Sequence, residues 1–151
     1  MSGDLATRQR ALVAALVAGA PVPAGFDGRL VGITREALLR KRAGEVARYW
    51  PALMAGLGAR WPSAFTRWAE GKPPQGGLRD GWDLARTLRA GGQLADPAAE
   101  ELAAREACWH YDGASAPRRR RLPAARIAGG SLVIQLAGRA RTFRPSRPAS
   151  S

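Results

Sequence analysis

The sequence is poor in the residues that build metal centres and disulfides. Its 151 residues include one cysteine, Cys108, and one histidine, His110. A lone cysteine excludes an intrachain disulfide, and a zinc site needs about four Cys, His or carboxylate ligands, which this pair cannot supply. A catalytic cysteine needs a base within reach. His110 comes two positions after Cys108, and side chains two positions apart on a helix point to roughly opposite sides. We therefore expect no metal, no cofactor and no catalytic residues, and a reducing, cytoplasmic location.

Long hydrophobic runs are also absent. No segment approaches the ~20 apolar residues of a membrane-spanning helix. The nearest run, residues 12–20, is rich in alanine and glycine, and Asp4 precedes it. Its larger apolar side chains fall on one helical face, so we predict an ordinary helix there, with neither a signal peptide nor a membrane segment.

Acidic residues are missing from the last part of the chain. Residues 1–117 contain fifteen Lys and Arg against twelve Asp and Glu, which gives +3, whereas residues 118–151 contain nine Arg and no acid, which gives +9 of the total of +12. The nearly neutral first part argues against nucleic-acid binding across the whole domain. Four adjacent cations repel one another and favour an acidic partner, either phosphate or carboxylate. They are Arg118, Arg119, Arg120 and Arg121.

Helical spacing of hydrophobic residues recurs in six segments that are separated by proline and glycine. We predict helices near residues 4–19, 34–49, 51–58, 61–71, 78–91 and 96–112. Short breaks between amphipathic helices are typical of a bundle. The predicted fold is therefore all-α, a six-helix bundle domain over residues 1–117.

After residue 117 the pattern changes to that of strands. Residues 125–128 and 132–136 flank Gly129-Gly130, which predicts a β-hairpin. Residues 118–144 would form an Arg-rich linker and a basic hairpin tail, and residues 145–151 a disordered end. An isolated hairpin is only marginally stable in water, so this one should pack on the bundle or extend a partner's sheet. Leu132 and Ile134 are accordingly candidate partner-binding residues.

Two groups of charged residues in the helices have both a structural and a functional interpretation. Glu106 falls within the apolar stripe of the last helix, so it needs a cationic partner. Arg42, Arg79 and Arg105 are possible partners, and we select Arg35, with a ligand-facing role as the alternative. The fifth helix begins with four residues that serve either the helix start and core or a peptide-binding surface: Arg79, Asp80, Trp82 and Asp83.

Several motifs, taken in order, resemble an actinobacterial helical domain that accompanies multinuclear non-haem iron-dependent oxidases. These oxidases modify ribosomally made peptides, and the resemblance extends more distantly to the domain labelled DNA-binding in their accessory proteins. The resemblance covers residues 8–144. Its motifs are residues 35–42 (REALLRKR), 78–83 (LRDGWD), 111–113 (YDG) and 116–123 (APRRRRLP).

In that family the oxidase is a TIM barrel that carries the iron and the chemistry, while the helical protein binds and presents the precursor peptide. The resemblance therefore implies a non-catalytic partner protein, and adds Tyr111 and Asp112 to the candidate peptide-binding residues. This chain lacks the second domain of the larger accessory proteins and has the basic hairpin instead. The alternative function is nucleic-acid binding through the Arg-rich C-terminal region, which should be salt-sensitive and unspecific.

Overall fold

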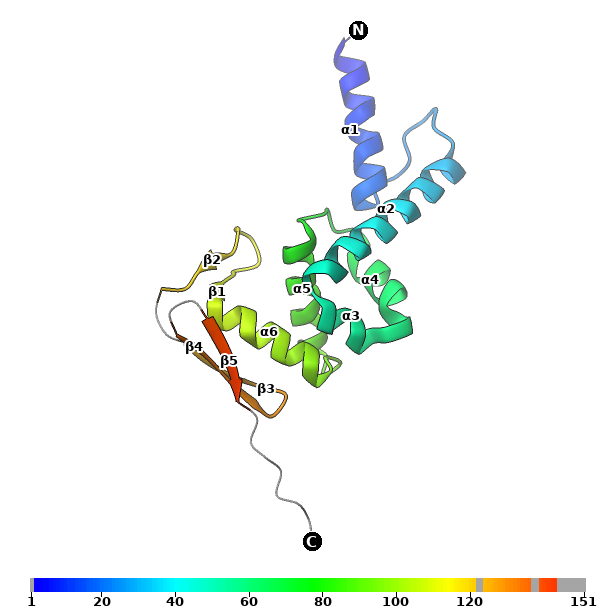
Figure 1. Cartoon of the computed structure of the whole chain (residues 1–151). Coiled ribbons are helices and arrows are strands. Elements are labelled where there is room, and N and C mark those ends of the chain that lie inside the picture. The colour runs from blue at the N-terminus through cyan, green and yellow to red at the C-terminus, as the bar shows by residue number, and fades with distance from the viewer. Residues whose placement is uncertain (1, 122–123, 137–138, 144–151) are drawn as a thin grey trace.

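The computed structural model describes residues 2–121, 124–136 and 139–143 (Figure 1). The predicted disordered end, residues 145–151, lies outside this part of the chain. Seven helical elements occupy the first two thirds of the sequence: α1 (Ser2–Ala18), α2 (Gly28–Tyr49), α3 (Pro51–Leu57), the 3-10 helix η1 (Gly58–Arg60), α4 (Trp61–Ala69), α5 (Gly77–Ala90) and α6 (Asp96–Cys108). No helix in the described part is both long and apolar enough to cross a membrane.

Strands follow the helices and form two antiparallel sheets. One has the order β1–β2 and the other has the order β3–β4–β5. The strands are β1 (Trp109–His110), β2 (Arg118–Arg119), β3 (Ala124–Ala128), β4 (Ser131–Leu136) and β5 (Arg139–Phe143). The prediction of an all-α six-helix bundle is therefore wrong, because the fold is mixed α/β and the larger sheet packs against α6 as part of the structure.

Large aromatic side chains form the centre of the helical body. Trp50 and Phe65 are fully buried, and Trp82 is 1% exposed. The Trp50 and Trp82 rings meet edge to face with centroids 5.8 Å apart, an arrangement favoured by their quadrupoles. Gly81 allows this contact, because a Cβ there would overlap the Trp50 indole. These aromatic side chains, from α4, α5 and the residue that follows α2, thus meet in one core.

Two helix boundaries differ from the predictions. α2 begins at Gly28, six residues before the predicted start, because Asp27 caps it and accepts a hydrogen bond from the Arg29 N–H at 2.8 Å. α6 ends at Cys108, before the predicted end near residues 111–113, because the backbone becomes extended at Trp109. Trp109 there pairs with Arg119, and this pairing forms the small sheet.

The three-stranded sheet lies on the alanine-rich side of α6. Ala103 and Ala107 contact Val133 of β4, which is fully buried. Ser131 donates a hydrogen bond to the Glu100 carboxylate at 2.8 Å, which ties the start of β4 to the helix. The predicted hairpin forms as β3 and β4 with Ala128 opposite Ser131, and β5 adds a third strand. Small side chains on α6 let the sheet approach closely.

The N-terminal part projects from this body. In Figure 1, α1 and the first half of α2 extend away from the other helices as an arm. We define the arm as residues 2–38. Its exposed apolar side chains are Leu5, Val13, Val22, Phe26, Leu30, Ile33 and Leu38.

Candidate functional site

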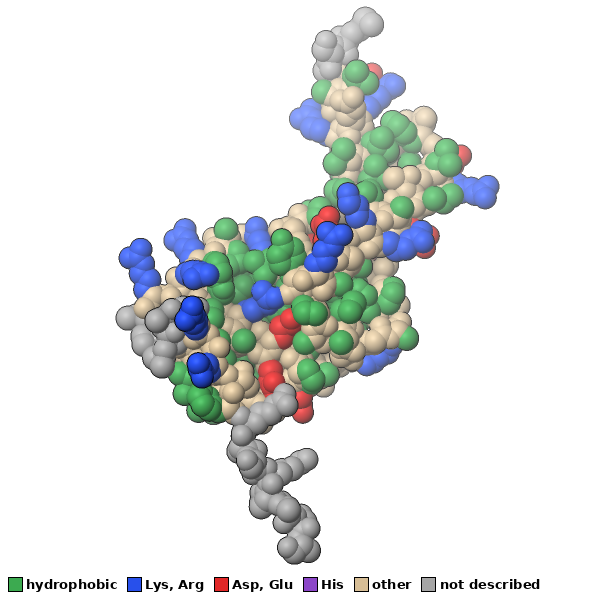
Figure 2. Space-filling view, in the orientation of Figure 1, with side chains coloured by type: hydrophobic (Ala, Val, Ile, Leu, Met, Phe, Trp, Pro, Cys, Tyr) green, Lys and Arg blue, Asp and Glu red, His purple; other side chains and the backbone are tan. Residues whose placement is uncertain are grey.

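A recess lined with arginine lies where α5, α6, β1, β3 and the residue that follows β2 meet. Its volume is about 390 Å³, and we call it the basic pocket. Lys and Arg side chains gather at this strand-bearing end of the molecule (Figure 2). Four guanidinium groups and one carboxylate give the lining a net charge of +3, which favours anionic ligands. The lining residues are Arg86, Arg89, Glu106, Trp109, His110, Tyr111, Arg120 and Arg126.

Glu106 is the only carboxylate in that lining. It accepts a hydrogen bond from Arg86 Nε on Oε1 at 2.9 Å and from Arg89 Nη1 on Oε2 at 3.0 Å. Burial by itself would raise the pKa of Glu106, but the two arginine hydrogen bonds outweigh it and lower the pKa below its ordinary value. The predicted partner, Arg35, is wrong, because it extends from α2 toward Gly19 instead.

The Arg run is partly built into the fold. Arg118 pairs with His110 and Arg119 with Trp109 across the small sheet, and the Arg119 guanidinium lies 5.2 Å from the Trp109 ring centre. Arg120 is half-buried, and its Nε donates to the carbonyls of Glu106 at 3.0 Å and Trp109 at 3.3 Å. The run is therefore not a uniform, solvated linker. Arg120 enters the basic pocket, while Arg118, Arg119 and Arg121 are exposed.

Asp80 lies inside the protein, not on a binding surface. It is fully buried and pairs with Arg42 of α2 through two contacts, at 2.7 and 2.9 Å. Arg42 also donates to the carbonyls of Lys72 and Pro73, so one ion pair joins α2, the loop before α5 and α5 itself. Trp82 is likewise enclosed by the aromatic core. Of the two interpretations of these residues, the structure supports the structural one.

Asp83 and Tyr111 form a polar link beside the core. The Tyr111 hydroxyl donates to Asp83 Oδ2 at 2.9 Å. Burial raises the pKa of Asp83 more than the Tyr111 hydrogen bond and nearby arginines lower it, and burial also raises the pKa of Tyr111. Tyr111 is buried, with its ring 5.1 Å from Trp82, so its main contacts are internal.

Asp112 and Arg79 order the loop between β1 and β2. The Asp112 carboxylate accepts hydrogen bonds from the backbone N–H groups of Ser115 and Ala114, and these lower its pKa to about 2. Arg79 reaches the Ala114 carbonyl from α5. Both residues are near the surface, yet their contacts hold this loop in place.

Leu132 and Ile134 lie on the sheet face that points away from α6. Their neighbours Ser131, Val133 and Gln135 are buried, and side chains alternate between the faces of a strand. Leu132 is opposite both Ile127 and Phe143 in the register, so an apolar row crosses the outer face. Both residues therefore lie on the outer face of the sheet, where Leu132 is exposed and Ile134 is half-buried.

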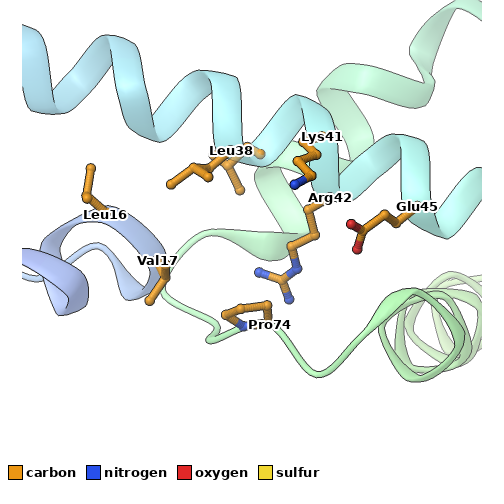
Figure 3. Close-up of a pocket in the computed structure, with 8 residues that line it drawn as sticks. Leu16, Val17, Leu38, Lys41, Arg42, Glu45 and Pro74 are labelled. Carbon is orange, nitrogen blue, oxygen red and sulfur yellow. The ribbon is translucent and has the colours of Figure 1, made fainter.

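A second, mainly apolar groove lies at the base of the arm. Its volume is about 200 Å³, and Figure 3 shows Leu16 of α1 across from Leu38 of α2, with Val17 and Pro74 lower in the view. Glu45 and Lys41 lie along its rim. Leu38, which lines the groove, is also one of the exposed apolar side chains of the arm. Such a surface suits a protein partner better than a charged ligand.

No group of three or more His, Cys, Asp or Glu side chains that could hold a metal occurs in the described part of the chain. Cys108 is half-buried at the end of α6, and His110 is exposed on β1.

The sequence comparison gives this architecture a family. A model of the SCO6045-like C-terminal domain matches residues 6–90, more than half of the chain. The chain belongs to this family. The match covers α2 to α5 and all of α1 except its first four residues, whereas α6 and both sheets follow it.

One relative extends further along the chain. It is a "UPF0276 protein" of Streptomyces avermitilis, 40% identical over 133 residues, which are 87% of this chain. The same residues are 27% of the relative's length, so this chain spans about a quarter of that protein. No solved structure matches.

Three arginines of the basic pocket were not among the residues predicted from the sequence. Arg86 and Arg89 lie three positions apart on α5 and therefore share a helix face, which was the available signal. Arg126 joins them only because β3 is placed beside α6. Sequence spacing alone does not bring residue 126 next to residue 89.

Proposed function

We propose that this protein is a non-catalytic partner that docks a multinuclear iron-dependent, peptide-modifying oxidase and helps to bind or present its precursor peptide. The oxidase would supply the iron and the chemistry. The oxidase class follows from the motif resemblance, and the case for docking to a larger body rests on the relative. In the Streptomyces relative, the equivalent of this chain is part of a polypeptide more than three times as long.

The arm is the surface that we assign to the oxidase. Leu30 is 61% exposed and Ile33 53% exposed, one helical turn apart on α2. Contiguous exposed apolar side chains on a helical surface mark a protein interface. A domain that shares a polypeptide with a larger body meets it at high effective concentration, so a modest interface suffices in that context.

Co-elution tests the docking. The oxidase body would be co-expressed with this chain, and complex formation measured by size-exclusion chromatography at micromolar concentration. We expect a complex with the native chain and none with the double variant Leu30→Glu, Ile33→Glu. Ile127→Glu is the matched control, since Ile127 is 81% exposed on the sheet, away from the arm.

Failure of the native chain to form any complex would contradict the proposal. Loss of the complex with Ile127→Glu alone would move the interface to the sheet. The competing function, nucleic-acid binding through the Arg-rich region, predicts duplex binding that weakens steeply with salt and is lost when Arg118, Arg119 and Arg121 become Ser.

A further inference from the structure

We propose that the basic pocket binds a carboxylate side chain of a peptide segment, with Arg120 and Arg126 as its main contacts. The inference rests on the proposed function, because it takes the ligand to be a peptide. It concerns a different surface from the arm, at the opposite end of the body (Figures 1 and 2).

The pocket keeps guanidinium donors that the fold does not use. Each guanidinium carries five N–H donors. Arg120 uses its Nε on two backbone carbonyls, and Arg89 uses Nη1 on Glu106. Arg126 is exposed, and its guanidinium has no hydrogen-bond or ion-pair partner among the described residues. The pocket therefore offers several N–H groups that converge on one recess.

The charge of these donors is not balanced within the pocket lining. Both oxygens of Glu106 are engaged by Arg86 and Arg89, and the lowered pKa keeps this carboxylate ionised at neutral pH. The sequence contains no acidic residue after Asp112, so the strands bring no further carboxylate. An anion from another molecule would complete the site, and carboxylates match guanidinium groups in a bidentate geometry.

The aromatic residues of the pocket favour a carboxylate over nucleic acid. Bases bind single-stranded sites by stacking on free aromatic rings. Here Arg119 lies over Trp109 at 5.2 Å, and Tyr111 is buried beneath Arg86, also at 5.2 Å. These rings support guanidinium groups by cation–π contact and are not open stacking platforms.

A fluorescein-labelled, capped tetraglutamate peptide tests the pocket by fluorescence anisotropy. We expect Arg126→Glu to weaken binding by about tenfold or more, because it replaces a charge-assisted contact with repulsion. Arg141→Glu is the matched control, with the same charge change on the outer face of the sheet. It should weaken binding by less than about threefold, since a rim charge acts through the general field.

Three results would overturn the inference: no binding of the peptide to the native chain, equal weakening by both variants, or tighter binding of an oligothymidylate with four phosphates. The third result would identify a nucleic-acid site. Circular dichroism would confirm that both exposed-site variants fold. Because no oxidase is present, failure of the docking experiment and failure of this one are independent results.

Discussion

The two halves of α2 have opposite environments, although they form one continuous helix. In the first half Leu30, Ile33 and Leu38 are exposed, whereas in the second half Arg42, Ala43 and Val46 are buried. The second half is covered by α4 and α5, and the first is contacted by α1. A charged residue is therefore buried where partner groups exist, whereas in the first half Val31 is buried and the other large apolar side chains named above are exposed.

The largest expected effect comes from removing an aromatic side chain that covers the second half. Phe65 is fully buried and Phe26, just before α2, is 41% exposed. Phe65→Ala should lower the free energy of unfolding by about 4 kcal/mol because it leaves a cavity in the core. Phe26→Ala, the matched change on the arm, should alter it by about 0.5 kcal/mol or less. Urea denaturation measures both, and similar losses would contradict the contrast between the two halves.

The buried ion pair that anchors α2 should come next. Asp80→Asn removes the charge that faces Arg42 and leaves a buried guanidinium unpaired. We expect a loss of about 3 kcal/mol in urea denaturation. Asp112→Asn, which acts on an exposed loop carboxylate, is the control and should cost much less. A native-like stability for Asp80→Asn would show that the pair does not fix α2.

The smallest effect concerns Glu106 and extends the comparison to the basic pocket. Glu106→Gln should lower the free energy of unfolding by about 2 kcal/mol at neutral pH, because it weakens the charged hydrogen bonds to the arginines. Since the folded-state pKa lies below the ordinary 4.5, this carboxylate stabilises the fold above that pH, and the contribution disappears as the pH falls through the lowered value. The variant should therefore lose less stability than the native chain between about pH 6 and pH 3.

Glu101→Gln supplies the matched control on the same helix. Burial raises the pKa of Glu101, so its charged form disfavours the fold at neutral pH, and this penalty disappears as the pH falls and the carboxyl takes up a proton. Thermal or urea unfolding across that pH range should show that this variant loses at least as much stability as the native chain when the pH falls. If Glu101→Gln flattened the pH profile as Glu106→Gln is expected to, Glu106 would not be the group responsible.

The candidate site was predictable in part. The Arg run and the apolar strand residues Leu132 and Ile134 stood out because like charges and alternation are local patterns. Asp80 and Trp82 had the same local appearance as surface residues, and only Arg42 and the Trp50 ring show that they are internal. The position of Glu106 in an apolar stripe predicted that it needs a cationic partner. Which arginine is that partner depends on how α5 packs against α6.

The sequence by itself determined the helical segments, their proline and glycine breaks, the turn at Gly129-Gly130 and the separation of charge between a nearly neutral body and an acid-free end. These depend on backbone preferences and on side chains a few residues apart. Only the tertiary structure decided that α6 stops at Cys108, that a three-stranded sheet covers it and that Arg126 meets Arg89 and Arg120 in one pocket. Those outcomes depend on contacts between residues distant in sequence, whose energies no local pattern contains.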